Sequence, residues 1–130
     1  MFPSAGFTSI RAENVETFGI VIAADPVFGT LAASTVENVL LDVRNADEWE
    51  AGHAARAQWI PLGELEAARF RLPMNRRIVC VCRSGVRSAR ATESLIAWGF
   101  DAANMAGGMK AWAASGLPVV RDDGTPGKVI

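Results

Sequence analysis

Residues 77–98, RIVCVCRSGVRSARATESLIAW, decide the fold. The run from Arg77 to Val81 is apolar and rich in β-branched residues, which predicts a buried strand. Cys82 to Arg87 contains Ser and Gly, which predicts a tight loop. From Ser88 to Trp98 apolar residues recur at helical spacing, and Gly99 follows in the position that suits a left-handed helix end. We therefore expect a strand, a loop and a helix in direct succession.

The same succession recurs on both sides of this stretch. Val39 to Val43 predicts a buried strand, and Asn45 with Glu48 then has the spacing of a capping box, which predicts a short helix closed at Gly52. Asp101 to Met105 predicts a further strand. Strands that alternate with helices favour βαβ units around a parallel sheet.

Two shorter segments also have helical spacing. Gly63 to Arg69 predicts a helix that turns Leu62, Leu65 and Phe70 towards the core. Met109 to Ala114 predicts another short helix, which begins after a double-glycine turn.

The two ends of the chain have weaker patterns. Residues 1–38 are only partly assigned: Ala12 to Phe18 is compatible with a helix, whereas the apolar stretch from Gly19 to Thr35 has no convincing period. Its role, as a lid, a dimer surface or a partner groove, stays open. We expect Asp122 to Ile130 to be a loosely held tail. A length of 130 residues fits one domain over residues 1–130.

Composition excludes several classes of protein. Apolar residues make up 50% of the chain and charged residues 21%, which suits a packed globule and excludes a disordered chain. A formal net charge of -1 lacks the basic field of a nucleic-acid binder. No apolar run approaches the roughly 20 residues that span a bilayer, and the start lacks a secretory signal, so we expect a cytoplasmic protein without a membrane partner.

The two cysteines, Cys80 and Cys82, lie two positions apart on the predicted strand. Side chains at that spacing point to one side with Cβ atoms roughly 6 to 7 Å apart, beyond the usual disulfide separation of about 4 Å. We therefore expect no disulfide, and two sulfurs do not make a zinc ribbon. No metal or organic cofactor is expected.

The loop from Cys82 to Ser88 has the features of an anion cradle. Its successive backbone N–H groups can converge on one point before the helix begins, and the helix dipole together with Arg83 and Arg87 adds positive charge there. Such surroundings can lower the pKa of a cysteine from about 8.5 to between roughly 3.5 and 7.5, which would make Cys82 a nucleophile. The alternative interpretation is that Cys82 is a small buried residue at a strand end.

The sequence resembles the rhodanese-like domain family, and the resemblance spans Val39 to Val120. The motifs that carry it occur in the family's order: Leu41-Asp42-Val43-Arg44, Glu48-Trp49, Gly52-His53, Ile60-Pro61, the loop Cys82 to Ser88, and Gly107-Gly108 with Trp112. After His53 the chain departs from the family pattern, with Ala54-Ala55-Arg56-Ala57 in place of a branched apolar residue and a Gly-Ala step, so the turn there could be rearranged.

The resemblance implies both a fold and an activity. The fold is an α/β domain with a mostly parallel sheet of about five strands, flanked by helices on both faces. The activity is that of a thiosulfate sulfurtransferase: Cys82 takes a sulfane sulfur from thiosulfate or a low-molecular-weight persulfide, holds it as a persulfide, and passes it to a thiol, to cyanide or to a protein acceptor. The physiological donor and acceptor, and the oligomeric state, are not determined by the sequence.

The other site residues receive supporting roles. The backbone of Arg83, Ser84, Gly85, Val86, Arg87 and Ser88 is expected to form the substrate-binding and anion-binding loop. Arg87 closes the loop and orients the donor or forms a surface ion pair, and Arg83 faces the pocket mouth or solvent. In the family pattern Asp42 and Arg44 support the loop from a strand end, with Asp42 supplying hydrogen bonds to it, and His53 lies in a structural turn.

Two alternatives to sulfur transfer remain. One is a rhodanese-like module that binds a partner or an anion without turnover. The other is a phosphatase or arsenate reductase, which we rank lower because relatives with those activities enclose five residues between Cys and Arg, whereas Cys82 and Arg87 enclose four. The shorter loop suits one sulfur better than a tetrahedral oxyanion.

Overall fold

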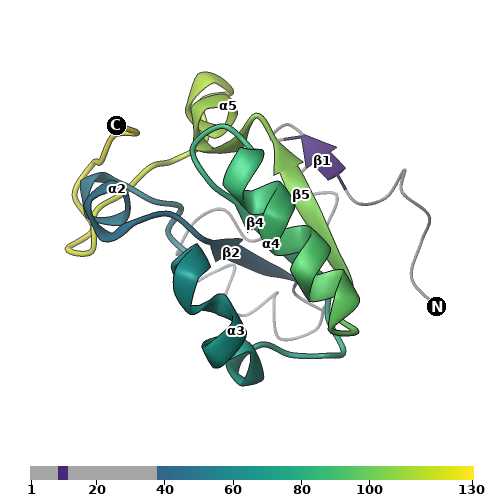
Figure 1. Cartoon of the computed structure of the whole chain (residues 1–130). Helices are drawn as coiled ribbons and strands as arrows, with labels where there is room; N and C mark the ends of the chain where they lie inside the picture. Colours follow the sequence, from purple (N-terminus) through teal and green to yellow (C-terminus); the bar gives the residue numbers. More distant parts are fainter. Residues whose placement is uncertain (1–8, 12–37) are drawn as a thin grey trace.

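The computed structural model describes residues 9–11 and 38–130, and these contain a five-stranded parallel sheet (Figure 1). The strand order is β1-β5-β4-β2-β3. The central strand β4 (Ile78–Val81) lies between β5 (Ala102–Ala106) and β2 (Val39–Asp42), with β1 (Ser9–Arg11) and β3 (Gln58–Trp59) at the edges. The predicted α/β class, strand number and parallel arrangement are confirmed.

Helices cover both faces of this sheet, as predicted. On one face α5 (Gly108–Ala114) packs Met109 and Trp112 against alternate strand residues such as Val79 and Met105. On the other face α4 (Val86–Ala97) and α3 (Leu65–Ala68) pack against residues of the opposite phase, among them Cys80. All four residues of β4 are buried, and side chains alternate across a strand, so β4 contributes to the hydrophobic core on each face of the sheet.

The segment around α3 differs from the prediction. The expected single helix is divided into η3 (Leu62–Glu64), α3, and η4 (Arg69–Arg71), and the two flanking pieces are 3₁₀ turns. Leu65 is buried as expected, but Phe70 is 82% exposed, so its predicted inward position is wrong. The tighter 3₁₀ turn changes the angle between successive side chains, and Leu72 enters the core in place of Phe70.

The helix after the cysteine loop begins earlier than predicted. α4 begins at Val86 rather than at Ser88, because Gly85 adopts a left-handed conformation with φ 109° and turns the chain directly into the helix. The preceding short helix α2 (Ala46–Ala51) ends at Gly52, and the amide N–H of Asn45 donates to the Glu48 carboxylate over 3.1 Å, as the capping box predicted.

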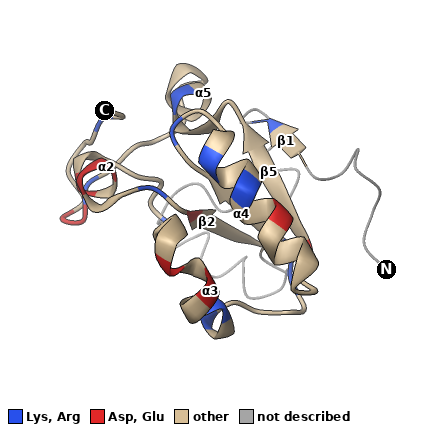
Figure 2. Ribbon diagram, in the orientation of Figure 1, with Lys and Arg blue, Asp and Glu red and all other residues tan. Residues whose placement is uncertain are grey.

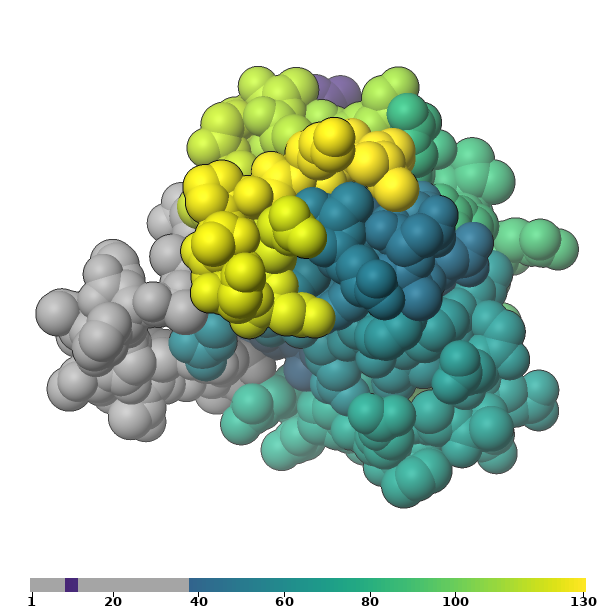
Figure 3. Space-filling model, turned by 90° about the vertical axis from the view of Figure 1, so that its left-hand side faces the viewer, coloured from purple at the N-terminus to yellow at the C-terminus, as the bar shows by residue number. Residues whose placement is uncertain are grey.

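The tail from Asp122 to Ile130 is not loosely held. The backbone of Val120 bridges to His53 and to Pro126, and the amide of Lys128 donates to the Ala51 carbonyl over 2.9 Å. Figure 3 shows the tail in yellow lying against the segment that contains α2. The expectation was wrong because these contacts join positions that are far apart in the sequence.

Two findings bear on the remaining expectations. The possible helix over Ala12 to Phe18 and the unassigned stretch from Gly19 to Thr35 lie outside the described residues. None of the helices in residues 9–11 and 38–130 has the length and apolar character that crossing a bilayer requires.

Candidate active site

Cys82 follows directly after the central strand β4, at the carboxyl edge of the sheet. Its Sγ accepts hydrogen bonds from the amide N–H of Gly85 (3.1 Å), the amide N–H of Ser88 (3.3 Å) and the hydroxyl of Ser88 (3.3 Å). The loop therefore curls around the sulfur, and of the successive amides that the sequence predicted to converge, those of Gly85 and Ser88 donate to it.

The environment of Cys82 favours the thiolate. The residue is only 1% exposed, and this burial by itself raises the pKa of the thiol. Hydrogen bonds from the Ser88 hydroxyl and from the backbone of Ser88, Gly85 and Ser84 act in the opposite direction, and the resulting pKa lies below the ordinary value. The thiolate is thus stabilised by fixed donors in place of water.

The start of α5 holds the cysteine loop from one side. The amide of Met109 donates to the Cys82 carbonyl over 2.8 Å, and the amide of Lys110 donates to the Arg83 carbonyl over 3.0 Å. This approach requires glycine at position 108, since a Cβ there would lie 2.5 Å from the Arg83 carbonyl oxygen. The Gly107-Gly108 step therefore lets the chain after β5 support the loop that follows β4.

Asn104 on β5 also holds the loop, and sequence analysis did not find it. Its Nδ2 donates to the Gly85 carbonyl over 3.1 Å, and its Oδ1 accepts from the Ser88 hydroxyl over 2.6 Å. The only signal in the sequence is one amide in an otherwise apolar strand, Ala102-Ala103-Asn104-Met105-Ala106.

Arg87 is held by a carboxylate on α2. Its Nη1 and Nη2 donate to Oε1 and Oε2 of Glu48 over 2.7 and 2.8 Å. The hydrogen bonds from Arg87 lower the pKa of Glu48, and the same carboxylate raises the pKa of Arg87. Of the two roles considered for Arg87, the geometry matches the ion pair, which ties the first turn of α4 to α2.

Arg83 and Val86 lie on the outer side of the loop. Arg83 is exposed, and its Nε donates to the carbonyl of Ile130 over 2.9 Å. Val86 is also exposed, at 71%. Figure 2 shows further basic residues on both α4 and α5, the helices that border the loop. An approaching molecule would therefore meet positive charge beside an apolar side chain.

Asp42 and Arg44 form a buried ion pair next to the loop. Both side chains are 0% exposed, and the Arg44 Nη2 lies 2.7 Å from the Asp42 Oδ2. The same Nη2 donates to the Gly52 carbonyl over 2.8 Å. We expected Asp42 to supply hydrogen bonds to the cysteine loop, but they go to Arg44, and the loop is held by Asn104 and α5 instead. The pair fixes the end of β2 relative to α2.

His53 is engaged away from the sulfur. Its ring stacks on Trp49 with centroids 3.6 Å apart, its Nε2 lies 2.9 Å from the Asp122 carboxylate, and its Nδ1 lies 3.1 Å from the Ala54 carbonyl. The turn that begins with Gly52 and His53 is thus fastened to the tail despite its unusual sequence.

Cys80 differs from Cys82 in the pKa of its thiol and in its place within β4, outside the loop. It is fully buried, and this burial raises the pKa of its thiol to about 12. Both cysteines are free thiols, which confirms that they form no disulfide. Cys80 is therefore part of the core under α4.

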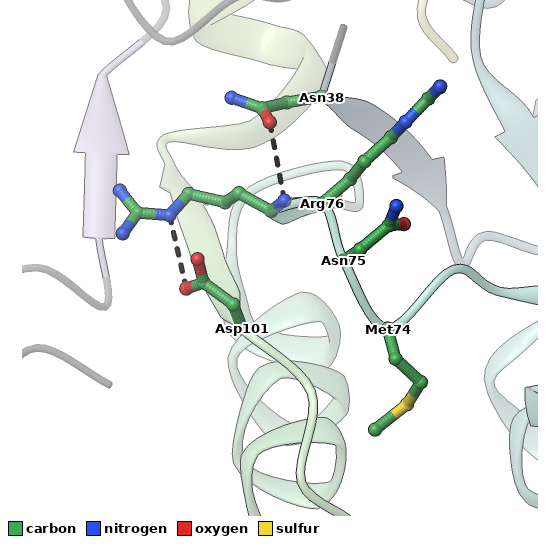
Figure 4. A pocket seen from close by; sticks show the side chains of 6 residues that line it. Asn38, Met74, Asn75, Arg76 and Asp101 are labelled. Carbon is green, nitrogen blue, oxygen red and sulfur yellow. Dashed lines mark hydrogen bonds and ion pairs between the residues drawn. The ribbon is translucent and has the colours of Figure 1, made fainter. Parts of the chain in front are cut away.

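A hollow of about 400 Å³ lies at the opposite, amino edge of the sheet (Figure 4). Arg77 donates from Nε to the Asp101 carboxylate over 3.1 Å and from its amide to the Asn38 side chain over 3.2 Å. These residues precede β4, β5 and β2, so their contacts fasten the amino ends of three strands. Cys82 lies at the other, carboxyl edge of the sheet, directly after β4.

Fold and site together define an α/β domain with a cysteine of lowered pKa in the loop between its central strand and a helix. The sequence model of the rhodanese-like domain family matches residues 30–115 of this chain. A protein of Allochromatium vinosum named "Sulfurtransferase" is 34% identical over 93 residues, which cover 71% of this chain and 87% of the relative. "Thiosulfate sulfurtransferase 16, chloroplastic" of Arabidopsis thaliana is 34% identical over 91 residues, which cover 60% of this chain and 76% of the relative.

The solved structures agree with the sequence comparisons. The crystal structure of a rhodanese-related protein from Thermoplasma volcanium matches with a TM-score of 0.68 and 28% identity, and the match covers 88% of this chain and 98% of that one. The chain belongs to the rhodanese-like domain family, so the resemblance found in its motifs is confirmed.

Proposed function

We propose that the protein is a sulfurtransferase that carries a sulfane sulfur as a persulfide on Cys82. The observation that carries the proposal is the convergence of the Gly85 amide, the Ser88 amide and the Ser88 hydroxyl on one sulfur atom. Hydrogen bonds to a charged sulfur favour the thiolate, which is the nucleophile in sulfur exchange. The names of the matched relatives support the same reaction class.

With thiosulfate as donor, the first step is a displacement at sulfur. The Cys82 thiolate attacks the outer sulfur of thiosulfate, a new S–S bond forms to Sγ, and the S–S bond of thiosulfate breaks so that sulfite leaves with the electron pair. The negative charge then resides on the outer sulfur of the persulfide. Thiosulfate is proposed because the Arabidopsis relative is named for it and because basic residues lie on α4 and α5, the helices that border the loop.

The second step returns the enzyme to its starting state. A thiophilic acceptor, such as a thiolate or cyanide, attacks the outer sulfur, the S–S bond to Sγ breaks, and Cys82 recovers its electron pair as thiolate. The loop donors stabilise this leaving thiolate as they stabilised the nucleophile. Each cycle therefore transfers one sulfur atom without a net redox change in the protein.

The remaining residues support this cycle by position. Arg83 at the outer side of the loop is proposed to attract the anionic end of the donor, while Arg87, already paired with Glu48, holds α4 in place. We also propose that the chain functions as one rhodanese-like domain, since the match covers 87% of the Allochromatium relative and 98% of the Thermoplasma structure.

Intact-protein mass spectrometry after exposure to thiosulfate tests the proposal. The parent protein should gain the mass of one sulfur and lose it again on addition of cyanide, whereas Cys82→Ser should gain nothing. Cys80→Ala is the matched control, because it removes the buried thiol and should still take up sulfur. Equal gain in parent and Cys82→Ser would refute persulfide formation on Cys82.

A further inference from the structure

Asn104 lies on the strand next to the one that delivers the nucleophile. It pairs with Cys80 in the register between β5 and β4, two positions before Cys82. Its side chain is partly buried and contacts the cysteine loop at two points, Gly85 and Ser88, which are both donors to the Cys82 sulfur. Asn104 therefore touches the groups that surround the sulfur without a hydrogen bond to the sulfur itself.

The two contacts determine which way the amide of Asn104 faces. A carbonyl oxygen only accepts hydrogen bonds, so the atom 3.1 Å from the Gly85 carbonyl must be the Nδ2 donor. The Oδ1 then faces the Ser88 hydroxyl at 2.6 Å, and it can only accept from that hydroxyl. The Gly85 contact also holds the carbonyl group of the residue whose own N–H points at the sulfur.

The Ser88 hydroxyl has two acceptors and one proton. Its oxygen lies 2.6 Å from Asn104 Oδ1 and 3.3 Å from Cys82 Sγ, both within hydrogen-bond reach. A neutral thiol competes poorly for that proton, whereas a thiolate is a strong charged acceptor. The backbone N–H groups that face the sulfur are fixed by the chain and cannot turn away, so among the groups named here this hydroxyl is the donor whose direction depends on the charge of Cys82.

We propose that Asn104 is a positioning residue that holds Gly85 in the loop and competes with Cys82 for the Ser88 proton. The hydroxyl turns to Sγ when the sulfur is a thiolate. It returns to Asn104 when Sγ is neutral, either as a thiol or, resting on the proposed function, as a persulfide with its charge on the outer sulfur. Asn104 thereby adjusts how strongly the protein without a bound sulfur stabilises the negative charge of the Cys82 thiolate.

The first test replaces the amide by a carboxylate. Asn104→Asp keeps the shape and the acceptor facing Ser88, but it loses the donor to Gly85 and adds a negative charge two hydrogen bonds from the sulfur. The pKa of Cys82, followed by the ultraviolet absorbance of the thiolate against Cys82→Ser in the same background, should rise by about one to two pH units. Asn75→Asp, the same change in the loop at the far edge of the sheet, should leave it in place (Figure 4). Equal midpoints in the two variants would overturn the proposal.

The second test asks whether Asn104 acts through the hydroxyl. In the parent, Asn104→Ala has two effects: it frees the Ser88 proton for the sulfur, and it removes the hydrogen bond to the Gly85 carbonyl. In a Ser88→Ala background there is no hydroxyl proton to free, so Asn104→Ala removes only the hydrogen bond to Gly85. The change in pKa caused by Asn104→Ala should therefore be more negative with Ser88 than without it, by about half a pH unit or more. Additive effects would refute competition for the proton, and circular dichroism of each variant verifies that it is folded.

Neither readout requires sulfur transfer. If the parent takes up no sulfur from thiosulfate but Asn104→Asp still raises the pKa, the proposed function fails and the role of Asn104 stands. If sulfur is taken up and the pKa does not respond to either substitution, the proposed function stands and the role of Asn104 fails.

Discussion

At the scale of single residues, the site depends on the balance between burial and hydrogen bonding at one sulfur. Burial is the largest influence on Cys82 and disfavours the thiolate, yet the pKa is lowered because several donors act together. Cys80 is the internal comparison: it lies within β4, two positions before Cys82 and outside the loop, and burial raises its pKa to about 12. The two thiols therefore differ both in how deeply they are buried and in the hydrogen bonds that the loop supplies to Cys82.

Removing the one side-chain donor should weaken this balance. Ser88→Ala takes away a hydrogen bond to the charged form, so the pKa of Cys82 should rise by about one pH unit, given that bonds to charged groups contribute about 1.5–3 kcal/mol and Asn104 shares this one. Sulfur uptake falls as the pH falls through the pKa of the folded enzyme, so this limb of the rate profile should move to higher pH. Stopped-flow uptake from thiosulfate across a pH series measures it.

Ser84→Ala is the matched control for that experiment. Ser84 is exposed, and it contributes to the lowered pKa of Cys82 through its backbone, which the substitution retains. Its pH profile should follow that of the parent. Equal displacement of both profiles would show that the loop responds to any loss of a hydroxyl and that Ser88 has no specific part.

At the scale of secondary-structure elements, the cysteine loop is supported from two neighbours. The first turn of α5 donates to the carbonyls of Cys82 and Arg83, while Glu48 on α2 binds Arg87 on α4. The contact to the Arg83 carbonyl fixes the peptide plane that carries the Ser84 N–H, one of the backbone groups that lower the pKa of Cys82. A change in how α5 packs should therefore reach the chemistry although α5 supplies no donor to the sulfur.

Gly108→Ala tests the support from α5. The new Cβ would lie 2.5 Å from the Arg83 carbonyl oxygen, at a residue whose φ is 59°, so α5 must move away from the loop. We expect a loss of about 2–4 kcal/mol in the free energy of unfolding, from backbone strain and a severe contact, together with slower sulfur uptake. Urea denaturation and the uptake rate are the measurements.

Gly116→Ala separates the contact from the strain. Gly116 also has a positive φ, 79°, but a Cβ there meets nothing within 4 Å. This variant should lose only the roughly 1–2 kcal/mol of a left-handed alanine and keep the parent uptake rate. If both variants lose the same stability and activity, the packing of α5 on the loop has no functional effect.

At the scale of the whole molecule, local patterns predicted most of the fold but little of what supports the site. The strands β2, β4 and β5 and the helix α4 follow from apolar periodicity and glycine stops, which are properties of neighbouring residues. The role of Asn104 depends on the pairing of β5 with β4, which no local pattern contains. The exposure of Phe70 depends on a choice between α and 3₁₀ turns that composition does not determine.

The tail was misjudged for the same reason. Polar and small residues from Asp122 onwards are typical of a loose end, but Gly127 lies so close to Gly52 that the two backbones touch. A Cβ on Gly127 would lie 2.7 Å from the Gly52 Cα and 2.8 Å from the Ala51 carbonyl oxygen. The tail thereby closes over the turn that contains His53 and the carbonyl bound by Arg44.

Gly127→Ala should therefore destabilise the whole domain and not only the tail. The methyl group would push the tail away from Gly52, break the hydrogen bond from the Lys128 amide to Ala51, and loosen the partner of the buried Arg44. We expect a loss of about 1–3 kcal/mol in the free energy of unfolding, which thermal denaturation would show as a lower Tm. Gly63→Ala, where a Cβ has open space and the φ is not positive, should leave Tm close to that of the parent. A backbone contact that stabilises the fold could not accept a methyl group 2.7 Å from the Gly52 Cα. If Gly127→Ala and Gly63→Ala give the same Tm, the tail therefore lies on the domain without contributing to its stability.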